Sequence, residues 1–147
     1  MEIERKFLLK HLPENLERYP SCRIEQSYLC TDPVIRIRRQ DNSFYLTYKG
    51  KGLMTREEYN LPLNEDAYEH LAAKADGHTI RKIRYKIPLG PYTIELDLFD
   101  FPANLIMAEV EFPTEEEALS FVAPDWFGED VTADPRYHNS NMIGRTV

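Results

Sequence analysis

The chain has 147 residues, of which 42% are hydrophobic, enough for a folded core and evidence against intrinsic disorder. Its 25 acidic residues outnumber the 18 basic ones and give a net charge of −7, which disfavours a nucleic-acid binder that contacts the phosphate backbone broadly. Because no apolar run could span a membrane and residues 1–20 lack the apolar centre of a signal peptide, we expect one cytoplasmic domain over residues 1–147 that binds neither nucleic acid nor a membrane.

Alternation of polar and apolar residues predicts that most of the chain forms β-strands. A short helical turn is expected within residues 14–20. A helix over 65–75 would begin at the N-cap Asn64 and end before Gly77, and a second helix would run from a capping box of Thr114 and Glu117 to residue 122. No element is assigned after residue 122. Strands are expected at 2–9, 23–29, 34–40, 44–49, 53–61 (ending at Pro62), 79–87, 94–98 and 106–112.

Charged residues recur at every second position in most of these strands, so they share one face of each strand. For any single strand, a solvated charged face is the ordinary interpretation. Many of these pairs, however, carry one sign of charge, and like charges on one face of a sheet repel. Grouped carboxylates suit a hard divalent cation, and grouped Arg and Lys suit phosphate oxygens. The acidic pairs are Glu2/Glu4, Glu95/Asp97 and Glu109/Glu111, and the basic pairs are Arg36/Arg38 and Lys82/Arg84.

Eight strands with hairpin-like spacing and only two sizeable helices predict a mainly β (α+β) fold with an antiparallel sheet. An eight-stranded closed sheet has an interior wide enough for side chains or one small ligand. Unpaired charges in a dry core would cost several kcal/mol each. We therefore expect an inverted eight-stranded antiparallel β-barrel, with a wet, charged tunnel inside and helices packed on its apolar outer face.

The sequence resembles the CYTH proteins, also called triphosphate tunnel metalloenzymes. Residues 2–6, Glu-Ile-Glu-Arg-Lys, match the Glu-x-Glu-x-Lys signature of that family. The resemblance extends over nearly the whole chain and implies an eight-stranded antiparallel tunnel that cleaves triphosphate-containing substrates with Mg²⁺ or Mn²⁺. Its further elements follow in order: Arg36-Ile37-Arg38, Tyr48-Lys49, Lys82-Ile83-Arg84, Glu95-Leu96-Asp97 and Glu109-Val110-Glu111-Phe112.

The resemblance also implies roles for individual residues. The metal ligands would be Glu2, Glu4, Glu109 and Glu111. The groups that hold phosphate oxygens would be Lys6, Arg36, Arg38, Lys49, Lys82 and Arg84. The remaining acids, Glu58, Glu95 and Asp97, would bind a second metal or orient water.

Two further positions, Asn60 and Tyr28, bear on the metal sites and on the general base. Where the family commonly has a second acid two residues after Glu58, this chain has Asn60, which brings a carbonyl oxygen but no charge. That departure argues against a tight second metal site. Tyr28 lies in a segment where some relatives pair a tyrosine with a lysine for general-base work, and its alternative role is packing within a strand.

The expected reaction is hydrolysis of a terminal phosphoryl group from inorganic tripolyphosphate or a nucleoside triphosphate. Three alternatives stay open. Adenylate cyclase activity would need a base-recognition pocket, for which the sequence offers no clear feature. Thiamine triphosphate hydrolysis would use the same tunnel, and non-catalytic binding of a polyphosphate or nucleotide is favoured by Asn60. The expected partner is a small triphosphate, and a homodimer is left open.

The cysteines and histidines form no recognisable reactive or zinc-binding set. Cys22 and Cys30 would lie about 26 Å apart along one strand, too far for a disulfide, so we expect reduced thiols. Trp126 and Phe127 are expected to pack, or to form a lid if they lie at a tunnel mouth. The histidines, expected at the surface or in loops, are His11, His70, His78 and His138.

Overall fold

The computed structural model of the chain describes residues 1–144, and residues 145–147 of the predicted domain lie outside the described part. The helices are α1 (Glu65–Ala72), α2 (Glu115–Ser120) and the 3-10 turns η1 (Leu16–Arg18), η2 (Pro135–Tyr137) and η3 (Asn139–Asn141). The strands are β1 (Glu2–Leu9), β2 (Ser21–Thr31), β3 (Val34–Gln40), β4 (Ser43–Lys49), β5 (Thr55–Arg56), β6 (Glu58–Leu63), β7 (Asp76–Leu89), β8 (Tyr92–Phe101), β9 (Ile106–Glu111) and β10 (Phe127–Asp130).

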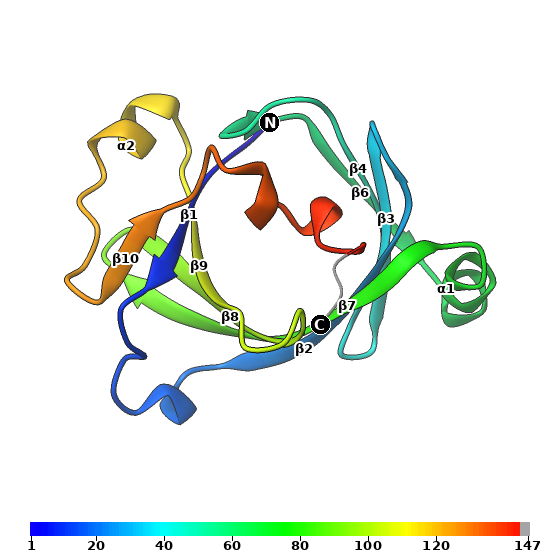
Figure 1. Cartoon of the computed structure of the whole chain (residues 1–147), viewed down its shortest axis with the longest axis horizontal. Coiled ribbons are helices and arrows are strands. Elements are labelled where there is room, and N and C mark those ends of the chain that lie inside the picture. Colours follow the sequence, from blue (N-terminus) through cyan, green and yellow to red (C-terminus); the bar gives the residue numbers. More distant parts are fainter. Residues whose placement is uncertain (145–147) are drawn as a thin grey trace.

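The strands form one antiparallel sheet that curls into a ring, with α1 and α2 outside it (Figure 1). Its order is β10-β1-β9-β8-β7-β2-β3-β4-β6, and β5 pairs with β1 across the closing seam. The predicted mainly β fold and eight-stranded antiparallel barrel are confirmed. Eight long strands make the wall, and β5 and β10 are short additions beside β1. Within residues 1–144, neither helix is long or apolar enough to cross a membrane.

Several predicted boundaries were wrong. The strand expected at 53–61 is two strands, because the chain switches partner from β1 to β4 after Arg56. β6 then continues through Pro62, which the sheet tolerates because β6 is an edge strand and needs no N–H donor there. The two helices end earlier than expected, at Ala72 and Ser120. The short strand β10 was not predicted.

Gly77 was expected just past the end of a helix, but it lies within β7 with φ 67°. A Cβ atom at this position would lie 2.8 Å from the Ile143 carbonyl oxygen. The neighbouring His78 N–H donates a hydrogen bond to the same oxygen at 2.6 Å. Gly77 therefore lets the C-terminal segment approach the backbone of β7.

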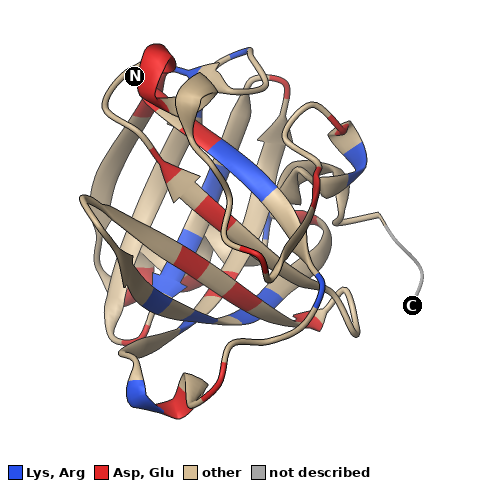
Figure 2. Ribbon diagram, turned by 90° about the vertical axis from the view of Figure 1, so that its left-hand side faces the viewer, with Lys and Arg blue, Asp and Glu red and all other residues tan. Residues whose placement is uncertain are grey.

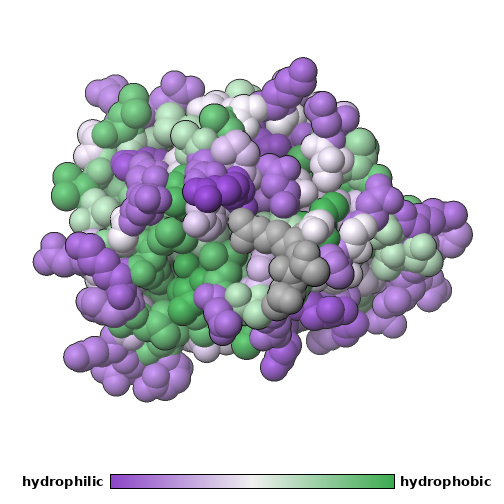
Figure 3. All heavy atoms as spheres, in the orientation of Figure 1, coloured by the Kyte–Doolittle hydropathy of each residue, from purple (hydrophilic) through white to green (hydrophobic). Residues whose placement is uncertain are grey.

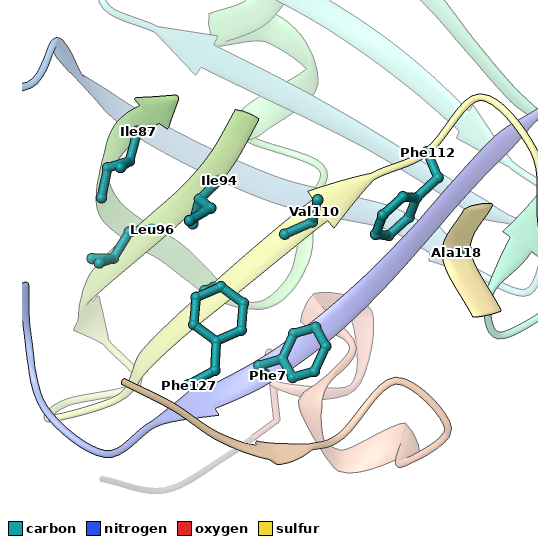
Figure 4. Packing of buried hydrophobic residues seen from close by; sticks show 9 residues of the cluster. Phe7, Ile87, Ile94, Leu96, Val110, Phe112, Ala118 and Phe127 are labelled. Carbon is teal, nitrogen blue, oxygen red and sulfur yellow. The ribbon is translucent and has the colours of Figure 1, made fainter. Parts of the chain in front are cut away.

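An apolar core lies on the outer face of the barrel. Phe7, Leu96 and Val110 come from the neighbouring strands β1, β8 and β9 and lie in one cluster (Figure 4). Ala118 of α2, with Phe121 and Trp126 from the segment leading to β10, packs against this cluster. The Phe7 and Phe127 ring centroids are 4.9 Å apart, and Trp126 packs edge-on to Phe127. Trp126 and Phe127 thus pack in this outer core, the first of the two expected roles, and do not form a lid.

A second apolar cluster, here called the inner floor, fills one end of the barrel interior. Its strand residues include Tyr28, Val34, Ile80 and Met107, and the C-terminal segment adds Val131, Met142 and Ile143. That segment crosses the ring in Figure 1, and Val131 N–H donates to the Lys6 carbonyl oxygen at 2.9 Å. In the same orientation, hydrophobic residues gather over β8, β9 and β10 (Figure 3). The inner floor leaves the charged residues to line the rest of the interior.

His138 lies in the loop between η2 and η3, as expected for a surface or loop residue, but it is buried. This histidine is 6% exposed, and its Nε2 atom lies 3.1 Å from the Thr132 carbonyl oxygen. It is buried because residues 131–143 fold back against the barrel. Neither the spacing of the histidines nor the local sequence predicts this long-range contact. Both cysteines are unpaired, as expected.

Candidate active site

The charged faces of the strands line one cavity of about 300 Å³ in the barrel. Figure 2 shows the basic and acidic residues in bands beside one another on the barrel strands. Because side chains alternate along each strand, residues two apart line the same interior. The predicted site residues that line the cavity are Glu2, Glu4, Lys6, Arg36, Arg38, Lys49, Glu58, Arg84, Glu95, Glu109 and Glu111.

The acids gather where β1 faces β9. In the strand register Glu4 lies opposite Glu111, and Lys6 lies opposite Glu109. Lys6 Nζ sits between two carboxylates, 3.1 Å from Glu4 and 2.9 Å from Glu109. Glu111 forms no ion pair among the described residues. Burial and the charge of Glu4 raise the pKa of Glu111 above its ordinary value.

The closing seam of the barrel holds a second group of charges. Lys49 Nζ, from β4, lies 2.8 Å from Glu2 and 3.3 Å from Glu58. Burial, followed by repulsion from Glu4, raises the pKa of Glu2 to about 8. A hydrogen bond with Glu2 and the charge of Lys49 outweigh burial and lower the pKa of Glu58 to about 2. The pKa shifts of the two carboxyls therefore run in opposite directions, upward for Glu2 and downward for Glu58.

Three of the predicted site residues do not line this cavity. Asp97 is 1% exposed and accepts from both Nε and Nη2 of Arg84, at 2.8 and 2.9 Å. Lys82 Nζ is 2.9 Å from the same carboxylate and is equally buried. Although burial opposes ionisation, Arg84 and Lys82 hold the pKa of Asp97 below its ordinary value. Tyr28, the third residue, lies in the inner floor.

The two arginines of β3 that line the cavity have no acidic partner. Arg36 and Arg38 form no ion pair within residues 1–144, whereas Lys6, Lys49, Lys82 and Arg84 each pair with a carboxylate. Arg36 Nε is buried without a hydrogen-bond acceptor. Burial, together with the charges of Arg36 and Arg84, lowers the pKa of Arg38 to about 9. Two adjacent, uncompensated guanidinium groups make the β3 wall of the cavity an anion-binding surface.

Asn60 is already engaged by its neighbours. Its Oδ1 atom accepts from the Thr47 hydroxyl at 2.6 Å, and its Nδ2 donates to Glu58 at 3.1 Å. The carbonyl oxygen that the sequence offered to a metal therefore faces Thr47, and the amide nitrogen supports the ionised form of Glu58.

Sequence reasoning missed several residues of the site, of which Gln26 and Asn139 matter most here. Gln26 lies in β2 opposite Arg38, and alternation with Ile24 and Tyr28 was a signal for its inward orientation. Asn139 reaches the cavity from η3, and the sequence carries no signal for that placement.

The acids of the cavity fit a hard divalent cation by their chemistry. Within the described residues, no three acid, His or Cys side chains already converge as a metal site. However, the raised pKa values of Glu2 and Glu111 both have burial and a neighbouring carboxylate as causes. A bound cation would relieve that repulsion, and carboxylate oxygens are the ligands that Mg²⁺ and Mn²⁺ prefer. Glu2, Glu4, Glu58 and Glu111 are the residues that could hold such an ion.

A barrel that is apolar outside and charged inside, with acids on one wall and unpaired arginines on another, defines a polyanion-binding tunnel protein. The CYTH domain profile matches residues 1–141, and the chain belongs to the CYTH domain family. That family is in general dependent on divalent metals.

Characterised relatives cover nearly the full chain. An inorganic triphosphatase of Nitrosomonas europaea is 39% identical over 148 residues, spanning 96% of this chain and 95% of the relative. An inorganic triphosphatase of Acetivibrio thermocellus is 36% identical, spanning 97% and 92%. The crystal structure of an inorganic triphosphatase aligns with a TM-score of 0.73 and 33% identity, covering 99% of this chain and 96% of that one. A Pyrococcus horikoshii protein at 23% identity and TM-score 0.62 shares the fold.

Proposed function

We propose that this chain is an inorganic triphosphatase, a divalent-metal-dependent hydrolase that releases phosphate from tripolyphosphate. The observation that carries the proposal is the pair of uncompensated guanidinium groups of Arg36, which is buried, and Arg38, which is half-buried. Both line one cavity together with a cluster of carboxylates. Relatives at 36–39% identity over nearly the full chain carry the same activity in their names. The proposed domain spans residues 1–147.

The cavity favours a compact substrate. Its volume of about 300 Å³ is at the lower end of the roughly 300–1,000 Å³ of sites for drug-sized ligands. Tyr45 is the one aromatic side chain among the described residues that line it. A nucleobase has little to stack on here, which supports inorganic tripolyphosphate over a nucleoside triphosphate and over adenylate cyclase activity.

In the proposed mechanism, Arg36 and Arg38 bind the phosphate oxygens and stabilise the charge that grows on them as the terminal phosphoryl group departs. Lys6 lines the same cavity, and Arg84 maintains the cavity wall through its ion pairs with Asp97 and Glu95. Glu2, Glu4 and Glu111 would hold Mg²⁺ or Mn²⁺, which neutralises phosphate charge when bound. Glu58, ionised by its surroundings, is suited to orient the attacking water by accepting a hydrogen bond from it.

Five of the predicted site residues take other parts in the proposal. Asp97 and Lys82 form a buried ion pair that orients Arg84 from below the cavity. Glu109 pairs with Lys6 at 2.9 Å, and Glu95 holds the outer side of Arg84 at 3.2 Å. The Tyr28 hydroxyl accepts a hydrogen bond from Gln26 below the cavity. The cavity is complete within one chain, so the mechanism does not require a dimer. The unpaired Cys22 and Cys30 support a reducing compartment, and we infer a cytoplasmic location.

The test is phosphate release by the purified chain from tripolyphosphate, ATP and thiamine triphosphate, each with Mg²⁺, with Mn²⁺ and with a chelator. We expect release to be fastest from tripolyphosphate and to stop with the chelator. Preferred turnover of ATP or thiamine triphosphate would reject the substrate assignment. Tight tripolyphosphate binding without turnover in any metal would favour the non-catalytic alternative.

A further inference from the structure

Arg38 is held by a neutral partner. Gln26 lies directly opposite Arg38 in the pairing of β2 with β3, and its side chain is fully buried. Its Oε1 atom accepts two hydrogen bonds from the guanidinium, from Nη2 at 2.9 Å and from Nε at 3.2 Å. Gln26 thus fixes one edge of the guanidinium plane.

The orientation of the Gln26 amide follows from the chemistry of its neighbours. A guanidinium group has only donors, so the amide oxygen must face Arg38. The amide nitrogen then faces Tyr28, and Nε2 donates to the Tyr28 hydroxyl oxygen at 3.1 Å. Both ends of the amide are satisfied, and the Gln26 side chain has one stable orientation.

Arg84, in the same barrel, is held in a different way. Two edges of its guanidinium face carboxylates, with Asp97 at 2.8 Å and Glu95 at 3.2 Å. Those carboxylates hold Arg84 and also cancel its charge. An amide holds a guanidinium with comparable geometry and leaves the full positive charge for another anion.

We propose that Gln26 is a positioning residue that orients Arg38 without neutralising it, and that it thereby sets the affinity of the cavity for the triphosphate. The proposal rests on the proposed function, because it takes the triphosphate to be the anion that binds the unneutralised positive charge of Arg38. It also assigns the arginines two roles. Arg38, held by an amide, binds the substrate, and Arg84, held by carboxylates, maintains the cavity wall.

The decisive variant is Gln26→Glu, which keeps the size and the acceptor oxygen but adds a charge that pairs with Arg38. We expect the metal-free affinity for tripolyphosphate, measured by titration calorimetry, to fall about 10- to 100-fold, in line with the strength of hydrogen bonds to charged groups. KM should rise by a similar factor while kcat changes less, and the melting temperature should be maintained or increase.

The matched control is Gln40→Glu. Gln40 lies two residues after Arg38 in β3, so this variant adds the same charge to the same wall of the cavity. Gln40 lines the cavity, and its side chain makes no hydrogen bond among the described residues. We expect its effect on affinity to be several-fold smaller than that of Gln26→Glu. An equal loss in both variants would mean that added charge alone lowers affinity, and would overturn the proposal.

Two further measurements keep the test decisive. In an Arg38→Met background, Gln26→Glu should add little to the loss of affinity, since its effect passes through Arg38. Full additivity would contradict the proposal.

If Gln26→Glu fails to fold, Gln26→Met is the deciding variant, because it removes the acceptor without adding charge. A raised KM supports positioning, and an unchanged KM overturns it. The metal-free binding data stand even if the wild-type chain releases no phosphate, so failure of the proposed function remains distinguishable.

Discussion

Lys49 Nζ lies 2.8 Å from Glu2 Oε1 and joins two strands, β4 and β1, that are not hydrogen-bonded neighbours. The pair spans the seam where the barrel closes. Both side chains are largely buried, so the contact is only weakly screened by solvent. The same ammonium also faces Glu58, and one cation therefore holds two of the acids that line the cavity.

Replacing that cation should weaken the metal-free barrel. Lys49→Met leaves Glu2 and Glu58 without their partner, and we expect a loss of about 2 kcal/mol in the free energy of unfolding. Because a divalent cation would supply the missing charge, Mg²⁺ or Mn²⁺ should stabilise the variant more than the wild type. Urea unfolding with and without metal measures both effects. Equal stability of variant and wild type in the absence of metal would contradict the role of this pair.

The arginines of the barrel should separate into functional and structural groups. Arg36→Met removes a buried charge with no acidic partner, so we expect unchanged or slightly higher stability and at least a hundredfold loss of tripolyphosphate hydrolysis. Arg84→Met is the matched control. It removes both hydrogen bonds that Arg84 donates to Asp97, leaves that buried carboxylate with Lys82 alone, and should destabilise the fold by about 3 kcal/mol. Thermal melts and phosphate release distinguish the two, and an Arg36→Met protein as unstable as Arg84→Met would refute this division.

Metal binding should depend on pH. The pKa of Glu2 is raised to about 8, so this carboxyl is mainly protonated at pH 7 in the metal-free protein. A metal must displace that proton, and its affinity should therefore rise with pH, approaching about tenfold per unit below pH 8, and level off above it. Calorimetry in buffers of different ionisation enthalpy would report the released proton. Affinity that stays constant between pH 6 and 8 would argue against Glu2 as a ligand.

The contact between β7 and the C-terminal segment should depend on glycine. Gly77→Ala forces φ 67° on an L-residue and places a Cβ against the Ile143 carbonyl oxygen, so we expect a destabilisation of about 2–3 kcal/mol. Gly90 also has positive φ, at 57°, but nothing lies within 4 Å of its Cβ position. Gly90→Ala should therefore cost only about 1 kcal/mol. Equal melting temperatures for the two variants would count against a close approach at Gly77.

Alternation along the strands could predict which side chains face the interior. Glu2, Glu4 and Lys6 were placed on one face from sequence, and all three line the cavity. Alternation does not predict, however, how deeply an inward-facing side chain is buried. Asp97 and Lys82 are buried as a pair, each 1% exposed, although Glu95 and Arg84, two residues away on the same strands, line the cavity.

Contacts between distant segments could not be predicted in the same way. Phe127–Asp130 is only four residues long and shows no clear alternation, yet it pairs with β1. Asn139 reaches the cavity because Val131, Met142 and Ile143 bury apolar surface in the inner floor. Gln26 carries no charge, so the segregation of charges, which revealed most of the site, did not reveal it.

The central claim is that arginines on one wall and metal-binding acids on the other act together on a triphosphate. Its most direct test is phosphate release from tripolyphosphate by the wild-type chain, measured with Mg²⁺, with Mn²⁺ and with a chelator. We predict release with a divalent metal and none with the chelator. Metal-independent release, or no release from any triphosphate in any metal, would contradict it.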